Sequence, residues 1–284
     1  MTLPSALHDF LHELGWGRVC AIRPIGGGCI NNAVRVETVH GPPALLKTNQ
    51  CGLPDMFACE SEGLRALAVK EGPRVPAVYG CGDDWILIEY FSASPKSDDY
   101  WESLGIGLAR LHMVTSERFG FTHDNYIGST LQPNPWTTDG HTFFCEHRLR
   151  FQGYLAHSQE MLSNQEMKML ERVIDRLPQL IMTQPASLSH GDLWGGNVIT
   201  GPGGEPVLID PAAHYGWAEA ELAMTILFGR FDRAAYDAYR SVRPIDPGYE
   251  DRFDLYNLYH LLNHLNLFGN GYHEAVMSIV RRYS

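Results

Sequence analysis

One segment in the last third of the chain constrains the fold more than any other. It reads His-Gly-Asp-Leu-Trp-Gly-Gly-Asn at residues 190–197, and Ile-Asp-Pro follows at residues 209–211. The apolar run that ends at Ile209 is typical of a short strand, which would place the carboxylate of Asp210 at its end. Turns of Gly, Asp and Asn are common by themselves, and so are strands that end in Asp-Pro, so the inference depends on their order and spacing.

Asp192, Asn197 and Asp210 form a set suited to phosphate chemistry. Phosphoryl transfer needs a carboxylate that orients the attacking hydroxyl group and oxygen ligands that hold Mg²⁺ against the phosphates. The spacing is similar to the catalytic loop and metal-binding Asp of kinases, with His-Gly-Asp in place of His-Arg-Asp. A kinase would also need a phosphate-binding loop, a strand Lys and a helix Glu upstream.

A Gly-rich segment lies between two predicted strands, at residues 19–25 and 33–39. Glycine lets backbone N–H groups approach phosphates closely, although hairpin turns are often Gly-rich as well. The candidate nucleotide-binding residues in this segment are Gly26, Gly27, Gly28, Cys29 and Asn31.

Lys47 ends an apolar Ala-Leu-Leu stretch that is typical of a strand, the position at which a kinase places the Lys that contacts the α and β phosphates. A helix is predicted over residues 55–69. Within it, Glu60, Leu64 and Leu67 share one face. An inward-facing Glu is costly unless it is paired, and Lys47 is the natural partner. A solvated helix carboxylate is the alternative interpretation.

An apolar run at residues 85–91 predicts a buried strand, and the polar residues that follow predict its end. This stretch is expected to link the two lobes of a kinase-like fold. The backbone of such a link hydrogen-bonds the adenine edge in kinases, so Glu89 and Phe91 are expected to bind ATP through their main chain.

The sequence resembles the fructosamine kinase (ketosamine 3-kinase) family, which is related to the aminoglycoside and choline kinases. The resemblance covers nearly the whole chain. Its most specific parts are the Leu-Trp-x-Gly-Asn continuation of the catalytic loop and the upstream Asp-Asn-x-Ile-Gly at residues 124–128. It implies a two-lobed, protein kinase-like α+β fold. A small β-rich N-lobe at residues 1–91 would bind nucleotide, and a mainly helical C-lobe at residues 92–284 would hold the catalytic and substrate-binding parts.

The resemblance also implies an activity and two cofactors, ATP and Mg²⁺. The expected reaction is phosphorylation of the O3 hydroxyl of a ketosamine, a fructosamine or ribulosamine that is free or protein-bound, as a step in protein deglycation repair. Asp192 would be the catalytic base, and Glu60 would hold the phosphate-binding Lys47. Asn197 and Asp210 would bind Mg²⁺.

Three further residues take their expected places from the same resemblance. His190 would support the structure by bonding the backbone near Asp210. Trp194 would lie beside the sugar, because aromatic faces pack well against sugar C–H surfaces; a place in the core is the alternative. Gln132, Asn134 and Arg148 would be scaffold or lid residues rather than catalytic ones.

The chain departs from the family pattern at three positions. Glu221 stands where the family usually has Asp, Ala218 where it has Arg, and Gly140 where it has Trp. These positions are expected in the C-lobe scaffold and the substrate wall, so they bear on substrate identity more than on ATP chemistry.

Composition narrows the class of partner. The 284 residues carry a net charge of −11 without a Lys/Arg cluster, which argues against a nucleic-acid partner and against an anionic membrane surface. Without a signal pattern or an apolar run of membrane-spanning length, the sequence predicts a cytoplasmic protein.

The six cysteines lack metal-site spacing and are expected to be reduced. Oxidation of Cys29 could block ATP binding, although a small residue that fills a turn is the alternative.

Helical periodicity predicts a mainly helical second half. Residues 119–136 are expected to be loop-rich because Gly, Pro and Asn break the periodicity there. Helices are expected at 3–14, 140–158, 164–181, 218–229, 232–241, 249–268 and 271–282.

Three other functions compete with a ketosamine kinase. A small-molecule kinase of the aminoglycoside or choline type is disfavoured by the Leu-Trp-Gly-Gly-Asn loop. A non-catalytic nucleotide-binding module is disfavoured because every expected catalytic residue is present. A metal-dependent hydrolase would leave Lys47 and Glu60 unexplained. The oligomeric state is open.

Overall fold

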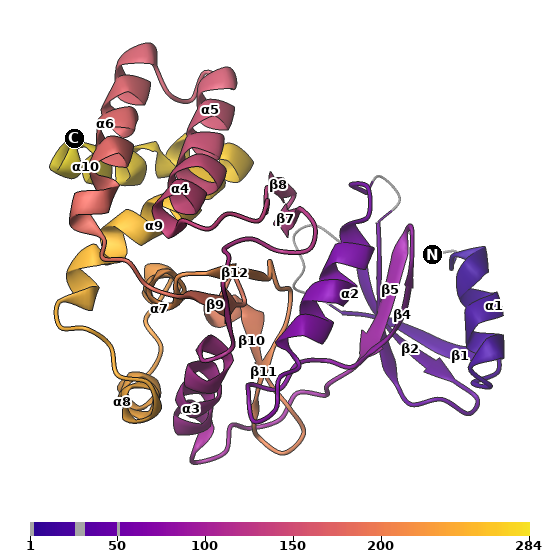
Figure 1. Ribbon diagram of the computed structural model, residues 1–284. Helices are drawn as coiled ribbons and strands as arrows, with labels where there is room; N and C mark the ends of the chain where they lie inside the picture. The colour runs from indigo at the N-terminus through magenta and orange to yellow at the C-terminus, as the bar shows by residue number, and fades with distance from the viewer. Residues whose placement is uncertain (1–2, 26–31, 50–51) are drawn as a thin grey trace.

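The computed structural model describes residues 3–25, 32–49 and 52–284, and it has two lobes (Figure 1). The N-terminal lobe, indigo to magenta, is built on a five-stranded antiparallel sheet, and most of the remaining chain is helical. The predicted α+β, protein kinase-like architecture is confirmed. The exact boundary at residue 91 stays a prediction.

The N-terminal lobe follows the predicted pattern, with the addition of β4, which was not predicted. Its elements are α1 (Ser5–Glu13), β1 (Val19–Pro24), β2 (Asn32–Thr38), β3 (Ala44–Thr48), α2 (Met56–Leu67), β4 (Val78–Gly82) and β5 (Trp85–Glu89). The strand order is β1-β2-β3-β5-β4. β5 ends at Glu89, short of the predicted end at residue 91.

The alternation of side chains along β3 determines which face of the sheet carries Lys47, and therefore which helix lies next to it. Successive side chains of a strand point to opposite faces of the sheet. α1 packs through Leu7 and Leu11 on the face that carries Leu46. α2 packs on the face that carries Ile86. Lys47 pairs with Ile86 across the β3–β5 ladder, so Lys47 also lies on the α2 face.

The helices of the C-terminal lobe confirm the predicted ones to within a few residues. They are α3 (Tyr100–His112), α4 (Gly140–Phe144), α5 (Phe151–Ser158), α6 (Asn164–Leu180), α7 (Ala218–Leu227), α8 (Arg233–Val242), α9 (Phe253–Phe268) and α10 (His273–Tyr283). A π-helical segment, η1 (Cys145–Arg150), joins α4 to α5, and the 3-10 turns η3 (Tyr249–Arg252) and η4 (Asn270–Tyr272) precede α9 and α10. A single apolar cluster that includes Leu104, Leu170, Leu222 and Leu262 holds these helices together.

Of the short strands of this lobe, only the one that ends next to Asp210 was predicted, and the prediction of a loop-rich segment at 119–136 was partly wrong. The strands are β6 (Thr115–Ser116), β7 (Asn125–Ile127), β8 (Thr130–Gln132), β9 (Ala186–Ser189), β10 (Val198–Thr200), β11 (Pro206–Leu208) and β12 (His214–Gly216). Strands this short have too few residues to show a period of two, and β12-β9-β6 pair across long sequence separations.

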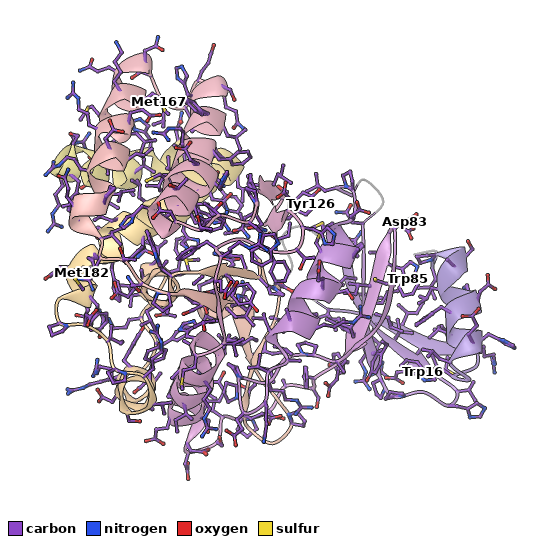
Figure 2. All side chains as sticks on the ribbon, viewed as in Figure 1. Trp16, Asp83, Trp85, Tyr126, Met167 and Met182 are labelled. Atoms are coloured by element: carbon purple, nitrogen blue, oxygen red, sulfur yellow. The ribbon has the colours of Figure 1, made fainter. Side chains whose placement is uncertain are left out.

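The β7–β8 hairpin also connects the lobes. Tyr126 lies at their junction in Figure 2, and its hydroxyl group donates to the carbonyl oxygen of Pro54 at 3.0 Å. Across the described ranges, none of the helices has the length and apolar character needed to cross a membrane.

Candidate active site

A β-hairpin brings the two halves of the catalytic motif together. β9 ends at Ser189, and a loop with the 3-10 turn η2 (Gly195–Asn197) leads into β10. β10 pairs with β11 so that Val198 faces Leu208, which places Asn197 next to Ile209. The amide of Ile209 donates to the carbonyl oxygen of Asn197 at 3.0 Å. Asn197 and Asp210 therefore meet at one end of this hairpin.

His190 connects the same two segments through hydrogen bonds to the backbone of each. Its Nε2–H donates to the carbonyl oxygen of Ile209 at 2.8 Å, and its Nδ1 accepts from the amide of Asp192 at 3.3 Å. Burial lowers the pKa of His190, which favours the neutral imidazole that can donate from one nitrogen and accept at the other. The bond to the backbone near Asp210 is the one predicted from the sequence.

Asp192 is held at the entrance of the site by Asn197. The Asn197 Nδ2 group donates to the Asp192 carbonyl oxygen at 2.8 Å and to Asp192 Oδ2 at 3.1 Å. Burial raises the pKa of Asp192 to about 7. A carboxylate with a pKa near neutrality is a better proton acceptor than an ordinary Asp. Because Nδ2 makes these contacts, Asn197 Oδ1 is the atom that could bind a cation.

Lys47 pairs with Glu60, as predicted, and it also joins the N-lobe to the segment after β11, which was not predicted. Its Nζ lies 2.5 Å from Glu60 Oε1, and it also bonds directly to Asp210 Oδ1. Burial acts to lower the pKa of Lys47, but Glu60 and Asp210 outweigh it and hold the pKa above its ordinary value. Lys47 is 8% exposed, so Glu60 is not a solvated helix carboxylate but the partner of a buried cation.

Asp210 adopts a backbone conformation that is uncommon for a residue with a side chain. Its φ angle is 56°, in the left-handed region that costs roughly 1–2 kcal/mol for a residue other than Gly. Non-Gly residues held in this region cluster at ligand sites, where surrounding contacts enforce them. Here the surrounding contacts are the His190 bond to Ile209 and the ion pair to Lys47.

Glu221 of α7 supports the catalytic loop from the C-lobe core, a role that the sequence did not reveal. Its Oε1 accepts from the Gly191 amide at 2.7 Å, and its Oε2 accepts from His112 Nε2 at 2.8 Å. His112 Nδ1 lies 2.8 Å from the hydroxyl group of Tyr239. Gly191 has a φ of 84°, and a Cβ there would lie 2.1 Å from the Ala212 carbonyl oxygen, so only glycine fits.

The other two departures from the family pattern also have local partners. A Cβ at Gly140 would lie 2.6 Å from the ring of Phe119 and 2.7 Å from Trp217 Nε1, so the buried indole of Trp217 occupies the space beside Gly140. Glu219, which follows Ala218, binds Arg252 through two contacts of 2.7 and 2.8 Å. Gly140 therefore lies in a packed aromatic environment, and Ala218 lies next to a residue that is held by an ion pair.

Trp194 lies at the surface beside Asp192 and not in the core. Its side chain is 38% exposed, and its indole contacts Phe228 edge-on, with ring centroids 6.0 Å apart. The core alternative for Trp194 is thereby excluded. A role beside the sugar stays a prediction.

Glu89 and Phe91, the predicted adenine-binding residues, are fixed by Arg74. Arg74 Nη2 lies 2.6 Å from Glu89 Oε1, its guanidinium group lies 4.7 Å from the centre of the Phe91 ring, and it also pairs with Glu205. The Glu89 amide donates to the carbonyl oxygen of Ala77 at 2.8 Å. The side chains of Glu89 and Phe91 therefore stabilise the segment that links the lobes. Their main-chain contacts to ATP stay a prediction. The phosphate-loop candidates Gly26, Gly27, Gly28, Cys29 and Asn31 lie outside the described residues.

Gln132, Asn134 and Arg148, which were predicted to be scaffold or lid residues, are buried and form a scaffold around the β7–β8 hairpin. Arg148 Nη2 donates to Asn134 Oδ1 at 2.7 Å, and Gln132 Nε2 donates to Asn125 Oδ1 at 2.7 Å. The Asn125 side chain in turn donates to the carbonyl oxygen of Ala213 at 2.8 Å. This network fixes the hairpin against the segment that follows Asp210.

The oxygen donors at this site suit Mg²⁺ better than a metal ion whose ligands all come from protein side chains. Among the residues that the structure describes, no cluster of three or more His, Cys, Asp or Glu side chains could hold a metal. Mg²⁺ is commonly bound by one or two protein oxygens together with water and substrate phosphates. Asn197 Oδ1 and the Asp210 carboxylate are such a pair.

Comparisons with known proteins agree with this geometry. The fructosamine kinase family model matches residues 11–284. A "probable ketoamine kinase" from Synechocystis sp. is 40% identical over 273 residues, which cover 93% of this chain and 90% of the relative. The chloroplastic protein-ribulosamine 3-kinase of Arabidopsis thaliana is 39% identical over 275 residues, 94% of this chain and 83% of the relative.

Solved structures show the same relationship. A Thermobifida fusca protein assigned as a fructosamine-3-kinase superposes with a TM-score of 0.90 at 32% identity, over 99% of this chain and 98% of the other. The aminoglycoside phosphotransferase APH(4)-Ia, in ternary complex with AMP-PNP and hygromycin B, has a TM-score of 0.66 at 16% identity over 98% of each chain, which shows a shared fold. The chain belongs to the fructosamine kinase family.

Proposed function

We propose that this chain is an ATP-dependent ketosamine kinase, which transfers the γ-phosphoryl group of ATP to a sugar hydroxyl group. The observation that carries the proposal is the joint placement of Lys47, Glu60 and Asp210 next to Asp192 and Asn197 in a member of the fructosamine kinase family. A hydrolase would have no use for the Lys47–Glu60 pair, and a pure binding module would have no use for Asp192.

Asp192 would act on the acceptor hydroxyl group. In the transfer, the hydroxyl oxygen forms a bond to the γ-phosphorus while the bond to the β–γ bridging oxygen breaks, and ADP leaves with that oxygen. The hydroxyl proton goes to the Asp192 carboxylate. Asn197 keeps that carboxylate oriented through the 3.1 Å contact to Oδ2. Positioning and charge stabilisation, which these residues supply, account for most catalysis of phosphoryl transfer.

Lys47 would contact the α and β phosphates, with Glu60 holding its ammonium group in place. Lys47 bonds directly to Asp210. When nucleotide binds, Lys47 would therefore turn to the phosphates and Asp210 to the metal. Asn197 Oδ1 and Asp210 would hold Mg²⁺, which when bound neutralises charge on the β and γ phosphates. The Gly-rich segment and the main chain of Glu89 and Phe91 would complete the ATP site.

The proposed acceptor is the O3 hydroxyl group of a ketosamine, either free or attached to a protein. Relatives named protein-ribulosamine 3-kinase support a ribulosamine and a protein-bound amine. Phosphorylation at O3 would serve deglycation repair. A cytoplasmic location stays a prediction.

The proposal is tested by Mg²⁺-dependent ADP release with a panel of acceptors: fructosyl-lysine, ribulosyl-lysine, erythrulosyl-lysine, an aminoglycoside and choline. Turnover of a ketosamine is expected, with the aminoglycoside and choline inactive. Turnover of only an aminoglycoside or choline would overturn the substrate class while keeping the phosphoryl-transfer site. ATP binding without turnover of any acceptor would point to the non-catalytic alternative.

A further inference from the structure

A row of five rings extends away from the catalytic loop along the C-lobe. We name it the aromatic stripe; it consists of Trp194, Phe228, His264, Phe268 and Tyr272. Neighbouring ring centroids lie 6.0 Å apart for Trp194 and Phe228, and 4.5 Å apart for Phe228 and His264. His264 contacts Phe268 at 5.4 Å and Tyr272 at 5.1 Å. These spacings are those of rings in contact, so the stripe is continuous from Trp194 to η4.

The two ends of the stripe are open to solvent. Trp194 is 38% exposed and Phe268 is 58% exposed, whereas α9 is largely buried up to Leu265. A single exposed aromatic residue needs no explanation. The exposed Trp194 and Phe268 are connected through the partly buried rings of Phe228 and His264, so they form one row that begins two residues after Asp192. Grouped exposed aromatic rings are more informative than a single one, because such surfaces mark interaction sites. The residues of the stripe follow the end of α7, the C-terminal half of α9 and the turn before α10.

The chemistry of the stripe favours an uncharged, extended ligand. His264 Nδ1 donates to the carbonyl oxygen of His260 at 2.8 Å, which leaves Nε2 as an acceptor. Burial lowers the pKa of His264, so the stripe adds no cation at neutral pH. Aromatic faces pack against C–H surfaces, and a lysine side chain presents four methylene groups before its nitrogen. A polycationic aminoglycoside would instead favour a wall of carboxylates.

We propose that the outer part of the stripe, Phe268 and Tyr272, binds the aliphatic amine side of the acceptor, as in a lysine-linked ketosamine, while the sugar lies at the Trp194 end. The inference rests on the proposed function and names the carrier of the sugar. A ketosamine on lysine reaches along the stripe, whereas one on methylamine ends near the catalytic loop. The enzyme would therefore select its acceptor by the length of the amine carrier as well as by the sugar.

The test is a chain-length series made on one sugar: the ribulosamines of methylamine, butylamine and Nα-acetyl-lysine. The wild-type kcat/KM is expected to rise along the series. Phe268→Ala should lose roughly 2- to 12-fold on the butylamine and acetyl-lysine adducts, the range of one aromatic contact, and leave the methylamine adduct unchanged. Phe268→Tyr, which keeps the ring, should retain the wild-type series.

The matched control is Tyr154→Ala, because Tyr154 is 55% exposed on α5 and lies outside the stripe. It should leave every member of the series unchanged. Equal effects of Phe268→Ala on all three adducts, or no effect on any, would overturn the stripe proposal while turnover of the methylamine adduct preserves the proposed function. If the wild type turns over neither the ribulosamines nor the same series made as fructosamines or erythrulosamines, both proposals fail.

Discussion

The phosphate side and the acceptor side of the site are built in different ways. On the phosphate side, hydrogen bonds and ion pairs fix the side chains: Lys47 is held by Glu60 of α2 and by Asp210, and Asp192 is held by Asn197. On the acceptor side, Trp194 and Phe268 are held by ring contacts and remain open to solvent. With the roles that we propose for these residues, directional polar contacts would fix the chemistry, while acceptor choice would depend on a surface that can change with little effect on that chemistry.

The largest effect is expected from Asp192→Ala, which removes the proton acceptor. A general base contributes about 10²- to 10⁴-fold, so kcat should fall by that factor. Because Lys47 and Asp210 remain, Mg·ATP binding should stay within a few-fold of wild type. Steady-state kinetics and calorimetric titration of nucleotide check the two halves of this prediction. A near-normal kcat would show that Asp192 is not the base.

Asp210→Ala should act on nucleotide binding itself. The substitution removes a proposed metal ligand and one of the two partners of Lys47. Losing an outer partner of a metal ligand typically costs about 10- to 100-fold, and loss of a ligand should cost at least as much in metal-dependent ATP affinity. Titration of ATP with and without Mg²⁺ checks this. Equal loss in both conditions would assign Asp210 to the ion pair alone and not to the metal.

Glu221→Asp tests whether the support beneath the loop matters for the chemistry. The shorter side chain cannot reach both the Gly191 amide and His112, which Glu221 contacts at 2.7 and 2.8 Å. We expect kcat to fall roughly 10-fold, the lower end for loss of a positioning contact, with the KM for ATP unchanged.

The control for that substitution is Glu250→Asp, because Glu250 pairs only loosely with Arg230 at the surface, at 3.2 Å. It should change neither kinetic parameter. If Glu221→Asp also leaves kcat unchanged, the loop is held by His190 and Asn197 without help from α7.

The smallest of these effects is expected from Trp194→Ala, on the acceptor side. Loss of one aromatic contact is worth about 0.5–1.5 kcal/mol, or roughly 2- to 12-fold, and it should appear in the KM for a ketosamine. The KM for ATP should not change, because Trp194 contacts Phe228 and not the Lys47 group. A loss shared equally by both substrates would contradict the division of the site into two sides.

The sequence predicted what depends on local patterns. Asp192 and Asn197 lie in one contiguous motif, and the Lys47–Glu60 pair followed from the kinase-like position of Lys47 at a strand end and from helix periodicity at Glu60. The supports contributed by Arg74 and Glu221 were not predictable, because each joins segments far apart in the chain. The same is true of the stripe, whose rings come from the catalytic loop, the end of α7, α9 and η4.

The central claim is that the Asp192 site phosphorylates a ketosamine. ³¹P NMR of the wild-type enzyme with ATP, Mg²⁺ and ribulosyl-lysine tests it most directly, with Asp192→Ala as the matched control. We predict a new sugar-phosphate resonance, coupled to the proton at C3, that grows with the ADP signal in the wild type and not in the variant. Loss of ATP signal with only inorganic phosphate formed, or the same sugar phosphate from both proteins, would contradict the account.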